Sequence, residues 1–581
     1  MCSSDLEQLS ELRRLGKPFD FWGIFEGEKN LAGPGYTMGQ CQLPPEEYDR
    51  LMAEVGDLFL GWELGEWDGL YGRDVVYYWR PEEYPSTRRE AHDRLVGWLS
   101  DLHRRLYSNA NCLCGVTLAH YFEELPVRML GAEIGQGLLN TQVYVAFLRG
   151  ACRQYDLQFK LLASVFDRWG YRCYTDSPDV TLENETGLGV WKAGPHQGHS
   201  IGLLKALWLS GFLAGAAIVG LDGGYYTDEL EGGVRQLSPL GEAFQAFTDW
   251  VRTDPARGKQ VRPLALLLDY YAGWAPPRHL YTFTERVVWH CLPYGPADHA
   301  MDQAFDLFYP DYGQAGYYHD ERGFLTATPL GEAADVLLSD ASIEALAAYP
   351  VVWLLSDEQP DDAFAARLRA YSEGGGHLIA GGPAGRALSE SWFGTGFAGE
   401  PVQGSVASVR ETAEEMREAF YSVWPVEPGE GWDVWTETEA GLPLIASHAF
   451  GEGRFTLLAA DHGLTNELTA PGFDMNHNLD FTPDPPFELL HVVQRYIRQV
   501  VREQMPVRLA GEGVYFAVNE LTQGEWLVGL YNPGFEPWRG EVILGQGVPI
   551  IEGLLAPWGE GPQLDGTRLQ LAPNTTGLLR V

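Results

Sequence analysis

Short apolar runs alternate with longer amphipathic stretches along the first 255 residues. This alternation is typical of repeated β/α units, in which a buried parallel strand is followed by a covering helix. The runs predict strands at Phe19–Phe25, Asp57–Trp62, Leu113–Leu118, Met129–Ala132, Phe159–Val165 and Ala216–Leu221. The stretches between them predict helices at Pro45–Val55, Thr87–Tyr107, Gln142–Tyr155 and Ser200–Ala214. Six strands indicate a (β/α)8 barrel of the TIM type, with one further strand expected within residues 166–199 and one before the start of the chain.

The pattern changes twice after this region. Residues 261–500 predict a doubly wound α/β domain, with a helix at Asp361–Tyr371 that stops at three glycines. Its predicted strands are Pro263–Asp269, Val351–Ser356, His377–Gly381 and Phe455–Ala460. From about residue 506 only short alternating runs remain, which predicts a small C-terminal β-sandwich. These runs are Gly513–Val518, Trp526–Asn532, Gly540–Leu544 and Arg568–Leu571. We therefore expect three domains, at residues 1–258, 259–504 and 505–581.

Two phrases of the middle region, Tyr349–Leu355 and Tyr371–Ile379, carry a family resemblance. They resemble the flavodoxin-like, glutamine-amidotransferase-like domain of family 42 β-galactosidases, whose domain order is also barrel, α/β domain and small β-domain. In amidotransferases a nucleophilic cysteine follows a strand at a sharp turn. Beyond Cys173 this chain has only Cys291, which fits no such turn. The resemblance therefore implies a structural or interfacial domain, through which copies of the chain would form a homo-oligomer.

The barrel resembles uncharacterised bacterial glycoside-hydrolase-like proteins more closely than it resembles family 42. The phrases that carry this resemblance are Gly65–Gly69, Gly131–Gln136, Leu148–Tyr155 and Ser164–Gly170. The resemblance implies a barrel enzyme acting on carbohydrate and names no substrate.

Composition narrows the class of partner. A net charge of −39 argues against nucleic acid, because a phosphate backbone is bound by basic residues, and it favours a neutral or cationic substrate. Aromatic residues make up 13% of the chain and include 19 Trp, whose flat faces suit sugar rings and also fill large cores. The acidity is equally a device for solubility.

The cysteines and the longest apolar stretch give information about the cellular location of the protein. Seven cysteines at irregular spacing, without a CxxC pair, indicate neither a disulfide framework nor a zinc site, which favours the cytoplasm. Ala206–Leu221 is interrupted by Ser210 and glycines, so we expect no membrane span. The opening Met1–Leu6 is typical of a translated sequencing adapter, so we expect the natural start, with any export signal, to lie upstream.

Carboxylates that directly follow predicted barrel strands are the candidate catalytic groups, because barrel active sites lie at the carboxyl ends of the strands. Glu133 is our first choice, since it ends an apolar strand of small residues. Glu66 and Asp222 follow two other strands. Each has a second interpretation: Glu133 at a helix N-terminus, Glu66 in a solvated acidic loop and Asp222 in an ordinary turn.

Glycoside hydrolysis needs one protonated and one ionised carboxyl group, which Glu133 with Glu66 or Asp222 can supply. The resemblance to family 42 implies retention of configuration by two glutamates, and favours Glu66 and Glu133. We expect neither a cofactor nor a metal, because the histidines of the 194–199 loop lack a third ligand. Substrate contacts are expected from the following residues: Trp62, Glu63, Trp67, Asp68, Gln136, Asn140, Asp167, Arg168, Trp169, His196 and Tyr225. Two alternatives stay open, a non-catalytic carbohydrate-binding barrel and a polysaccharide lyase.

Overall fold

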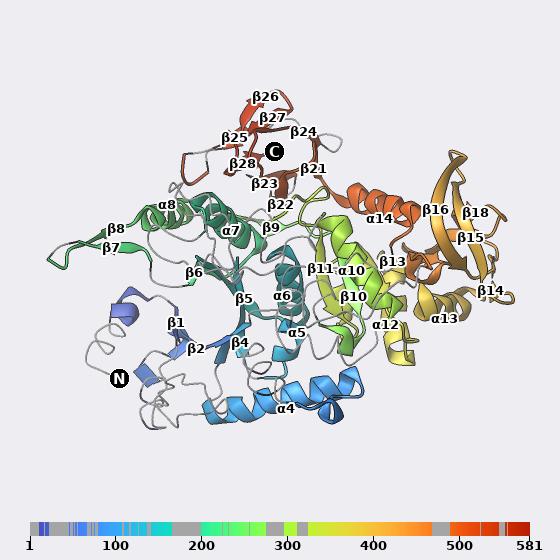
Figure 1. Cartoon of the computed structure of the whole chain (residues 1–581), viewed down its shortest axis with the longest axis horizontal. Helices are drawn as coiled ribbons and strands as arrows, with labels where there is room; N and C mark the ends of the chain where they lie inside the picture. The colour runs from blue at the N-terminus through green and yellow to red at the C-terminus, as the bar shows by residue number, and fades with distance from the viewer. Residues whose placement is uncertain are drawn as a thin grey trace.

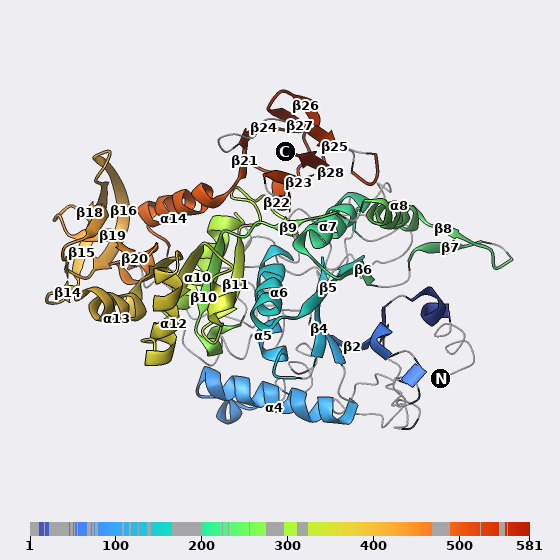
Figure 2. The same cartoon turned by 180° about the vertical axis from the view of Figure 1, so that it is seen from behind.

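The structure is a computed structural model, and most of the chain can be described from it. The described residues, with short gaps inside the ranges, are 11–22, 56–66, 79–106, 110–114, 118–135, 141–165, 199–274, 295–310, 324–466, 488–544 and 552–581. Figures 1 and 2 show the chain from opposite sides, with the N-terminal units next to the middle region and the C-terminal sheets above their junction. In these ranges no helix combines the length and apolar character needed to cross a bilayer.

Six parallel strands form the first sheet, and their spatial order is their order in the chain. They are β1 (Phe19–Trp22), β2 (Phe59–Glu66), β3 (Ala110–Cys114), β4 (Val127–Ile134), β5 (Gln158–Ser164) and β6 (Ile218–Asp222). The helices around them are α4 (Arg88–Leu106), α5 (Ala119–Phe122), α6 (Thr141–Tyr155), α7 (Ile201–Ala214) and α8 (Pro239–Thr253). A hairpin, β7 (Thr227–Glu229) with β8 (Arg235–Leu237), leads into α8. Parallel strands in chain order with helical crossovers are the arrangement of a (β/α) barrel.

A strand forms at or next to each of the six predicted positions in this region, and the bounds of one need correction. The strand predicted at Leu113–Leu118 occupies Ala110–Cys114 instead, and Leu118 is the residue that begins α5. The prediction followed the apolar residues, whereas the strand includes the polar Asn111, which pairs with Glu63 of β2. The predicted helix Pro45–Val55 lies largely outside the described residues, while the other three match α4, α6 and α7 within one residue.

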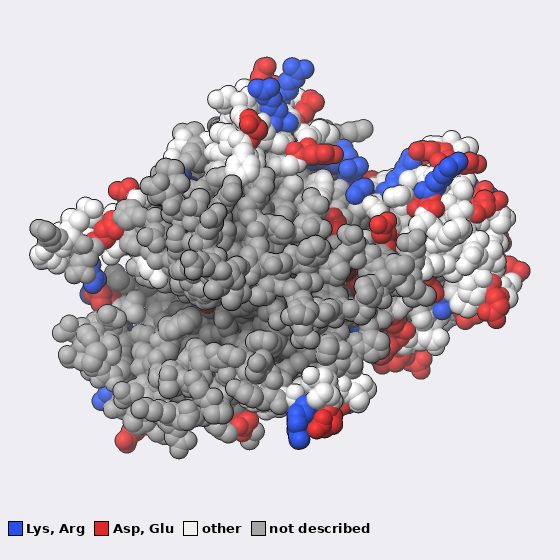
Figure 3. Space-filling view, viewed as in Figure 1, with Lys and Arg blue, Asp and Glu red and all other residues white. Residues whose placement is uncertain are grey.

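The middle region forms one nine-stranded sheet, in the order β11-β10-β12-β13-β20-β19-β18-β15-β16. Its parallel strands are β10 (Leu264–Leu268), β11 (Ala334–Leu338), β12 (Val351–Leu355), β13 (His377–Ala380) and β20 (Gly453–Leu458). The antiparallel ones are β15 (Val402–Val409), β16 (Glu414–Val423), β18 (Trp432–Thr438) and β19 (Pro443–Phe450). The helices here are α10 (Pro296–Phe308), α11 (Ile343–Leu346), α12 (Asp362–Glu373), α13 (Gly382–Phe393) and α14 (His491–Gln504). Acidic side chains are spread over the antiparallel end of this sheet, where the surface faces solvent (Figure 3).

Two small antiparallel sheets follow α14. One contains β21 (Val507–Ala510), β24 (Trp538–Leu544), β26 (Gln563–Asp565) and β27 (Arg568–Leu571). The other contains β22 (Tyr515–Thr522), β23 (Glu525–Asn532), β25 (Glu552–Leu554), β28 (Thr575–Arg580) and, at its edge, β9 (Lys259–Gln260). The strand β9 comes from the segment between the first and middle regions, so that segment is bound to the C-terminal sheet by backbone pairing with β22.

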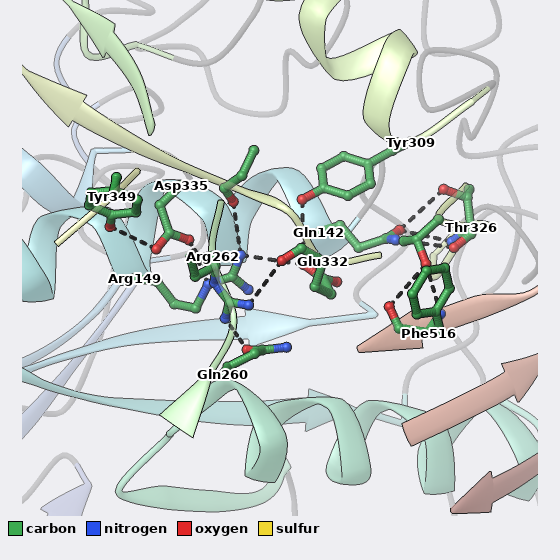
Figure 4. Close-up of polar contacts among 12 residues, drawn as sticks. Gln142, Arg149, Gln260, Arg262, Tyr309, Thr326, Glu332, Asp335, Tyr349 and Phe516 are labelled. Carbon is green, nitrogen blue, oxygen red and sulfur yellow. Dashed lines mark hydrogen bonds and ion pairs between the residues drawn. The ribbon is translucent and has the colours of Figure 1, made fainter. Parts of the chain in front are cut away.

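Helix α6 of the first region packs against β11 of the nine-stranded sheet around a fully buried ion cluster (Figure 4). Asp335 accepts hydrogen bonds from Arg149 at 2.8 Å and from Arg262 at 3.2 Å, and Tyr349 donates to its other oxygen at 2.9 Å. Burial raises the pKa of Asp335, but the two guanidinium groups outweigh it and hold that pKa below its ordinary value. The cluster therefore joins two regions of the chain through charges that satisfy one another.

Candidate functional site

Glu133 lies at the carboxyl end of β4, on the face of the first sheet that points away from α7. The opposite face is identified by Gly211 of α7, where a Cβ atom would lie 3.2 Å from Leu161 and 3.3 Å from Val219. Glu133 pairs in register with Leu162, the neighbour of Leu161, so its side chain points to the other side. It is only 3% exposed. Active sites of (β/α) barrels lie at this end of the strands, so Glu133 remains a candidate for a catalytic role.

The same face of the sheet carries two buried polar side chains on β5 that the sequence analysis did not select. Lys160 is 2% exposed and pairs with Gly131, two residues before Glu133, and Ser164 is fully buried at the end of β5. A lysine is almost never buried without a functional or electrostatic reason. The signal was available, because Lys160 interrupts the apolar run that predicts β5. The face therefore holds a carboxyl and an ammonium group away from bulk water.

Glu66 and Asp222 occupy the last positions of β2 and β6, each two strands away from β4. Glu66 pairs with Leu113 of β3, and Leu113 pairs with Gly131 of β4. Along the strand direction, Glu66 is therefore level with Gly131, two residues before Glu133. Asp222 pairs with Ser164 of β5, which lies two residues beyond Leu162, the partner of Glu133. At the usual strand spacing, two strands separate backbones by roughly 10 Å. The register thus brings the backbone positions of all three predicted carboxylates to one end of the sheet.

His199 connects the carboxyl ends of β4 and β5. Its backbone N–H donates to the carbonyl of Val165 at 3.2 Å, and its Nε2 forms a short hydrogen bond with the carbonyl of Gly135. Gly135 has a φ of 77°, which a residue with a side chain rarely adopts, so glycine is needed for this turn. The ring of His199 meets Phe324 edge-on, with centroids 4.8 Å apart. His199 is 3% exposed and lies against Gly135, two residues beyond Glu133 in the chain.

Residues 324–326 of the middle region reach the same end of the first sheet. The backbone N–H of Thr141, the first residue of α6, donates to the carbonyl of Phe324 at 2.9 Å. The side chain of Gln142 bonds the backbone of Thr326 in both directions, donating at 3.1 Å and accepting at 2.8 Å. The contacts between Gln142 and Thr326 are drawn in Figure 4. A segment from the middle region therefore borders the candidate site, which no local pattern in the first 255 residues could indicate.

The other predicted site residues are described only in part. Tyr225 follows β6 and is half-buried, and its carbonyl accepts a hydrogen bond from the Ser238 hydroxyl that begins α8. The backbones of Trp62 and Glu63 lie in β2. The remaining predictions fall outside the described residues: Trp67, Asp68, Gln136, Asn140, Asp167, Arg168, Trp169 and His196. Across the part of the chain that can be described, no group of three His, Cys, Asp or Glu side chains is placed to hold a metal ion.

Comparison with known proteins gives a match in structure alone. No protein-family model matches the chain, and no curated protein matches it in sequence. Among solved structures, the GH42 β-galactosidase Gan42B from G. stearothermophilus superposes with a TM-score of 0.52 at 10% identity, over 99% of this chain and 90% of that one. The β-galactosidase from the Antarctic haloarchaeon Halorubrum lacusprofundi superposes with a TM-score of 0.51 at 11% identity, over 100% of this chain and 92% of that one. The chain therefore has the mixed α/β fold of GH42-type glycoside hydrolases, which contain a TIM barrel.

Proposed function

We propose that this protein is a glycoside hydrolase that cleaves a neutral oligosaccharide or polysaccharide with a pair of carboxyl groups. The observation that carries the proposal is the buried Glu133 at the carboxyl end of β4, in a fold shared with GH42 β-galactosidases. Glu66 and Asp222, at the ends of β2 and β6, are the candidates for its partner. Gan42B and the Halorubrum lacusprofundi enzyme, which superpose with TM-scores above 0.5, are β-galactosidases, so aryl β-galactosides are the first substrates to test.

The chemistry needs the two carboxyl groups at a set separation. Retaining enzymes hold them about 5–5.5 Å apart, and inverting enzymes hold them about 6.5–9.5 Å apart to admit water. Positions two strands apart, with glutamate side chains directed to a common centre, can satisfy the shorter distance. We favour retention with Glu66 and Glu133: one attacks the anomeric carbon while the other protonates the leaving oxygen, and water then releases the sugar.

The proposal also covers the division of the chain into three domains. We assign the barrel to residues 1–258, a flavodoxin-like domain of the glutamine-amidotransferase type to 259–504, and a β-sandwich to 505–581. The parallel strand order β11-β10-β12-β13-β20 supports the flavodoxin-like assignment. In flavodoxin-like sheets, as here, the second strand along the chain, β11, is at the edge, next to the first strand, β10. By analogy the middle domain is where copies of the chain associate, and sedimentation velocity would measure this.

A panel of aryl glycosides tests the activity, with wild type, Glu133→Gln and a control variant, Glu415→Gln, in the exposed part of β16. Removing a general acid or base, or a nucleophile, is expected to lower kcat by about 10²-fold or more, while the control stays at wild-type activity. Full turnover by Glu133→Gln on a confirmed substrate would show that Glu133 is not catalytic. Substrate binding without turnover by wild type would identify a binding barrel, and an unsaturated product would identify a lyase.

Azide separates the two roles of the carboxyl groups. If Glu133 is the acid and base, azide should restore turnover of Glu133→Gln on a substrate with a good leaving group, and the glycosyl azide should keep the substrate's configuration. If Glu133 is the nucleophile, the glycosyl azide should be inverted. NMR of the first product of wild type gives the stereochemical outcome directly.

A further inference from the structure

A cavity of about 460 Å³ opens at the amino-terminal end of the first sheet, opposite the end that carries Glu133. It is bounded by the start of β5, the ends of α6 and α7, and the segment that leads into β9. Five basic side chains line it: Arg149, Arg153, Arg257, Lys259 and Arg262. We call it the basic cavity. It is separate from the candidate site, since it lies at the other end of the strands.

Acidic groups in the basic cavity do not balance the basic ones. Among the described residues, the acidic ones that line it are Asp156 and Asp335, so five cations and two anions leave a charge of +3. Adding Glu332, which pairs with Arg149 at 3.3 Å from just outside, leaves +2. The chain as a whole carries −39. An excess of positive charge in one hollow of so acidic a protein indicates that the hollow is suited to an anion.

The five cations of the basic cavity differ in how far their charges are satisfied. Arg149 and Arg262 pair with Asp335. Arg257 donates to the last carbonyl groups around the end of α7, at 2.7 Å for Ala216, and burial lowers its pKa. Arg153 lies over the ring of Tyr349 at 4.9 Å, and Lys259 is exposed to the opening.

No carboxylate of the described residues lies within ion-pair distance of Arg153, Arg257 or Lys259. Capping of a helix end explains the position of Arg257. It does not explain the charge of Lys259, and Arg153 meets, among these residues, only the longer-range attraction of Asp335.

Gln260 supplies an independent sign of a missing acceptor. Its side chain is 92% buried, and its carbonyl oxygen accepts a hydrogen bond from Arg262, which fixes which end of the amide is nitrogen. Gln260 lines the basic cavity, and its amide nitrogen, Nε2, has no acceptor among the described residues (Figure 4). A buried donor without an acceptor costs about 1–3 kcal/mol, so a bound group that accepts its hydrogen bond would be stabilised.

We propose that the basic cavity binds the phosphate group of a small phosphorylated molecule, with Lys259, Arg153 and the Gln260 amide as donors. Phosphate accepts several charge-assisted hydrogen bonds at once, which suits two cations without carboxylate partners beside one amide donor. The volume exceeds that of bare phosphate and falls in the range of small-molecule sites, about 300–1,000 Å³, so a sugar ring can accompany the phosphate. The walls belong to the first sheet, the nine-stranded sheet and the segment paired with the C-terminal sheet, so an occupant would stabilise their packing.

Thermal unfolding of the full chain with inorganic phosphate, glucose 6-phosphate, glucose or sodium chloride at matched ionic strength tests the site. We expect Tm to rise with the logarithm of phosphate or glucose 6-phosphate concentration and to ignore glucose and sodium chloride. Equal rises would identify inorganic phosphate as the ligand, and a larger rise with glucose 6-phosphate would show that the sugar is also bound. A rise that sodium chloride reproduces, or no rise, would overturn the proposal.

Variants locate the effect in the basic cavity. Lys259→Gln should weaken binding by about tenfold or more, whereas Arg417→Gln, an exposed arginine of β16, should bind as wild type. Ala217 is an exposed residue of the cavity wall. Ala217→Glu should abolish the rise by repulsion, and the isosteric Ala217→Gln should retain it. An unchanged rise in both Lys259→Gln and Ala217→Glu would also refute the site, independently of any glycosidase activity.

Discussion

Gly150, in the middle of α6, gives a sharp test of how the first region docks on the nine-stranded sheet. A Cβ atom at this position would lie 1.7 Å from the carbonyl oxygen of Val336 and 2.7 Å from its carbonyl carbon. Contacts below 3.0 Å essentially do not occur for real Cβ atoms. Both partners are backbone atoms of regular elements, so no side-chain rotation can relieve the overlap. Gly150→Ala must push α6 and β11 apart by more than an ångström.

Two opposing effects decide the sign of the change in stability. Alanine in a helix interior is favoured over glycine by about 1 kcal/mol. Overpacking costs about 1–3 kcal/mol, and here it also stretches the adjacent pair between Arg149 and Asp335, whose loss would cost about 3–5 kcal/mol. We therefore expect a net loss of roughly 3 kcal/mol. Gly97 of α4 is the matched control, because no atom of the described residues would lie within 4 Å of a Cβ atom placed there. Gly97→Ala should show only the helical gain of up to about 1 kcal/mol.

Urea unfolding followed by tryptophan fluorescence measures both variants. A chain of 581 residues need not unfold in one step, so the transition midpoints are compared. Gly150→Ala should unfold at lower urea than wild type, and Gly97→Ala at equal or higher urea. If the midpoint of Gly150→Ala matched that of Gly97→Ala, the close packing of α6 on β11 would be wrong.

Two further substitutions test buried carboxyl groups. Asp335→Asn should lower the free energy of unfolding at pH 7 by about 3–5 kcal/mol, because it leaves Arg149 and Arg262 buried with Glu332 alone, and an unchanged urea midpoint would contradict this. Burial raises the pKa of Asp269 to about 7, with a hydrogen bond from Ser356 opposing the shift. The native carboxyl then holds its proton up to pH 7 while the unfolded one ionises near 3.8, so wild-type stability should fall as pH rises between these values. The amide introduced by Asp269→Asn cannot ionise. The stability of this variant relative to wild type should therefore grow from pH 4 to pH 8, by at most about 4 kcal/mol. A difference that does not depend on pH would refute the raised pKa of Asp269.

Most of the parallel strands could be predicted from the sequence because each contains a short apolar run, and β10 and β12 are buried at every position. All six strands of the first sheet and four strands of the nine-stranded one follow from such runs. The antiparallel strands at the end of that sheet were missed, and in β15, β16 and β18 buried positions are interspersed with exposed or half-exposed ones. In β16, Glu414–Val423, half of the ten residues are exposed, including Phe420 at 63%. A run of this kind does not stand out from a polar loop.

Long-range pairing explains the other omissions. The strand β11 contains a fully buried aspartate, Asp335, which reads as a polar interruption until Arg149, 186 residues earlier, is placed beside it. The two residues of β9 form a strand only because β22 lies next to them. At the candidate site, the position of Glu133 at a strand end followed from the sequence. Phe324, which borders the site, comes from another region and has no local signal.

Helix α6 links the candidate site to the middle region along its whole length. Its first residue, Thr141, bonds to Phe324 beside the site, Gly150 in its middle packs directly on β11, and Gln154 near its end bonds Asp340 at 2.6 Å. This helix follows β4, the strand that carries Glu133. Because buried charges and direct backbone contact fix one docking position, a shift of the nine-stranded sheet would move the helix and the end of its strand together. We therefore expect the docking of the nine-stranded sheet to influence the candidate site, although Glu133, Glu66 and Asp222 all lie in the first sheet.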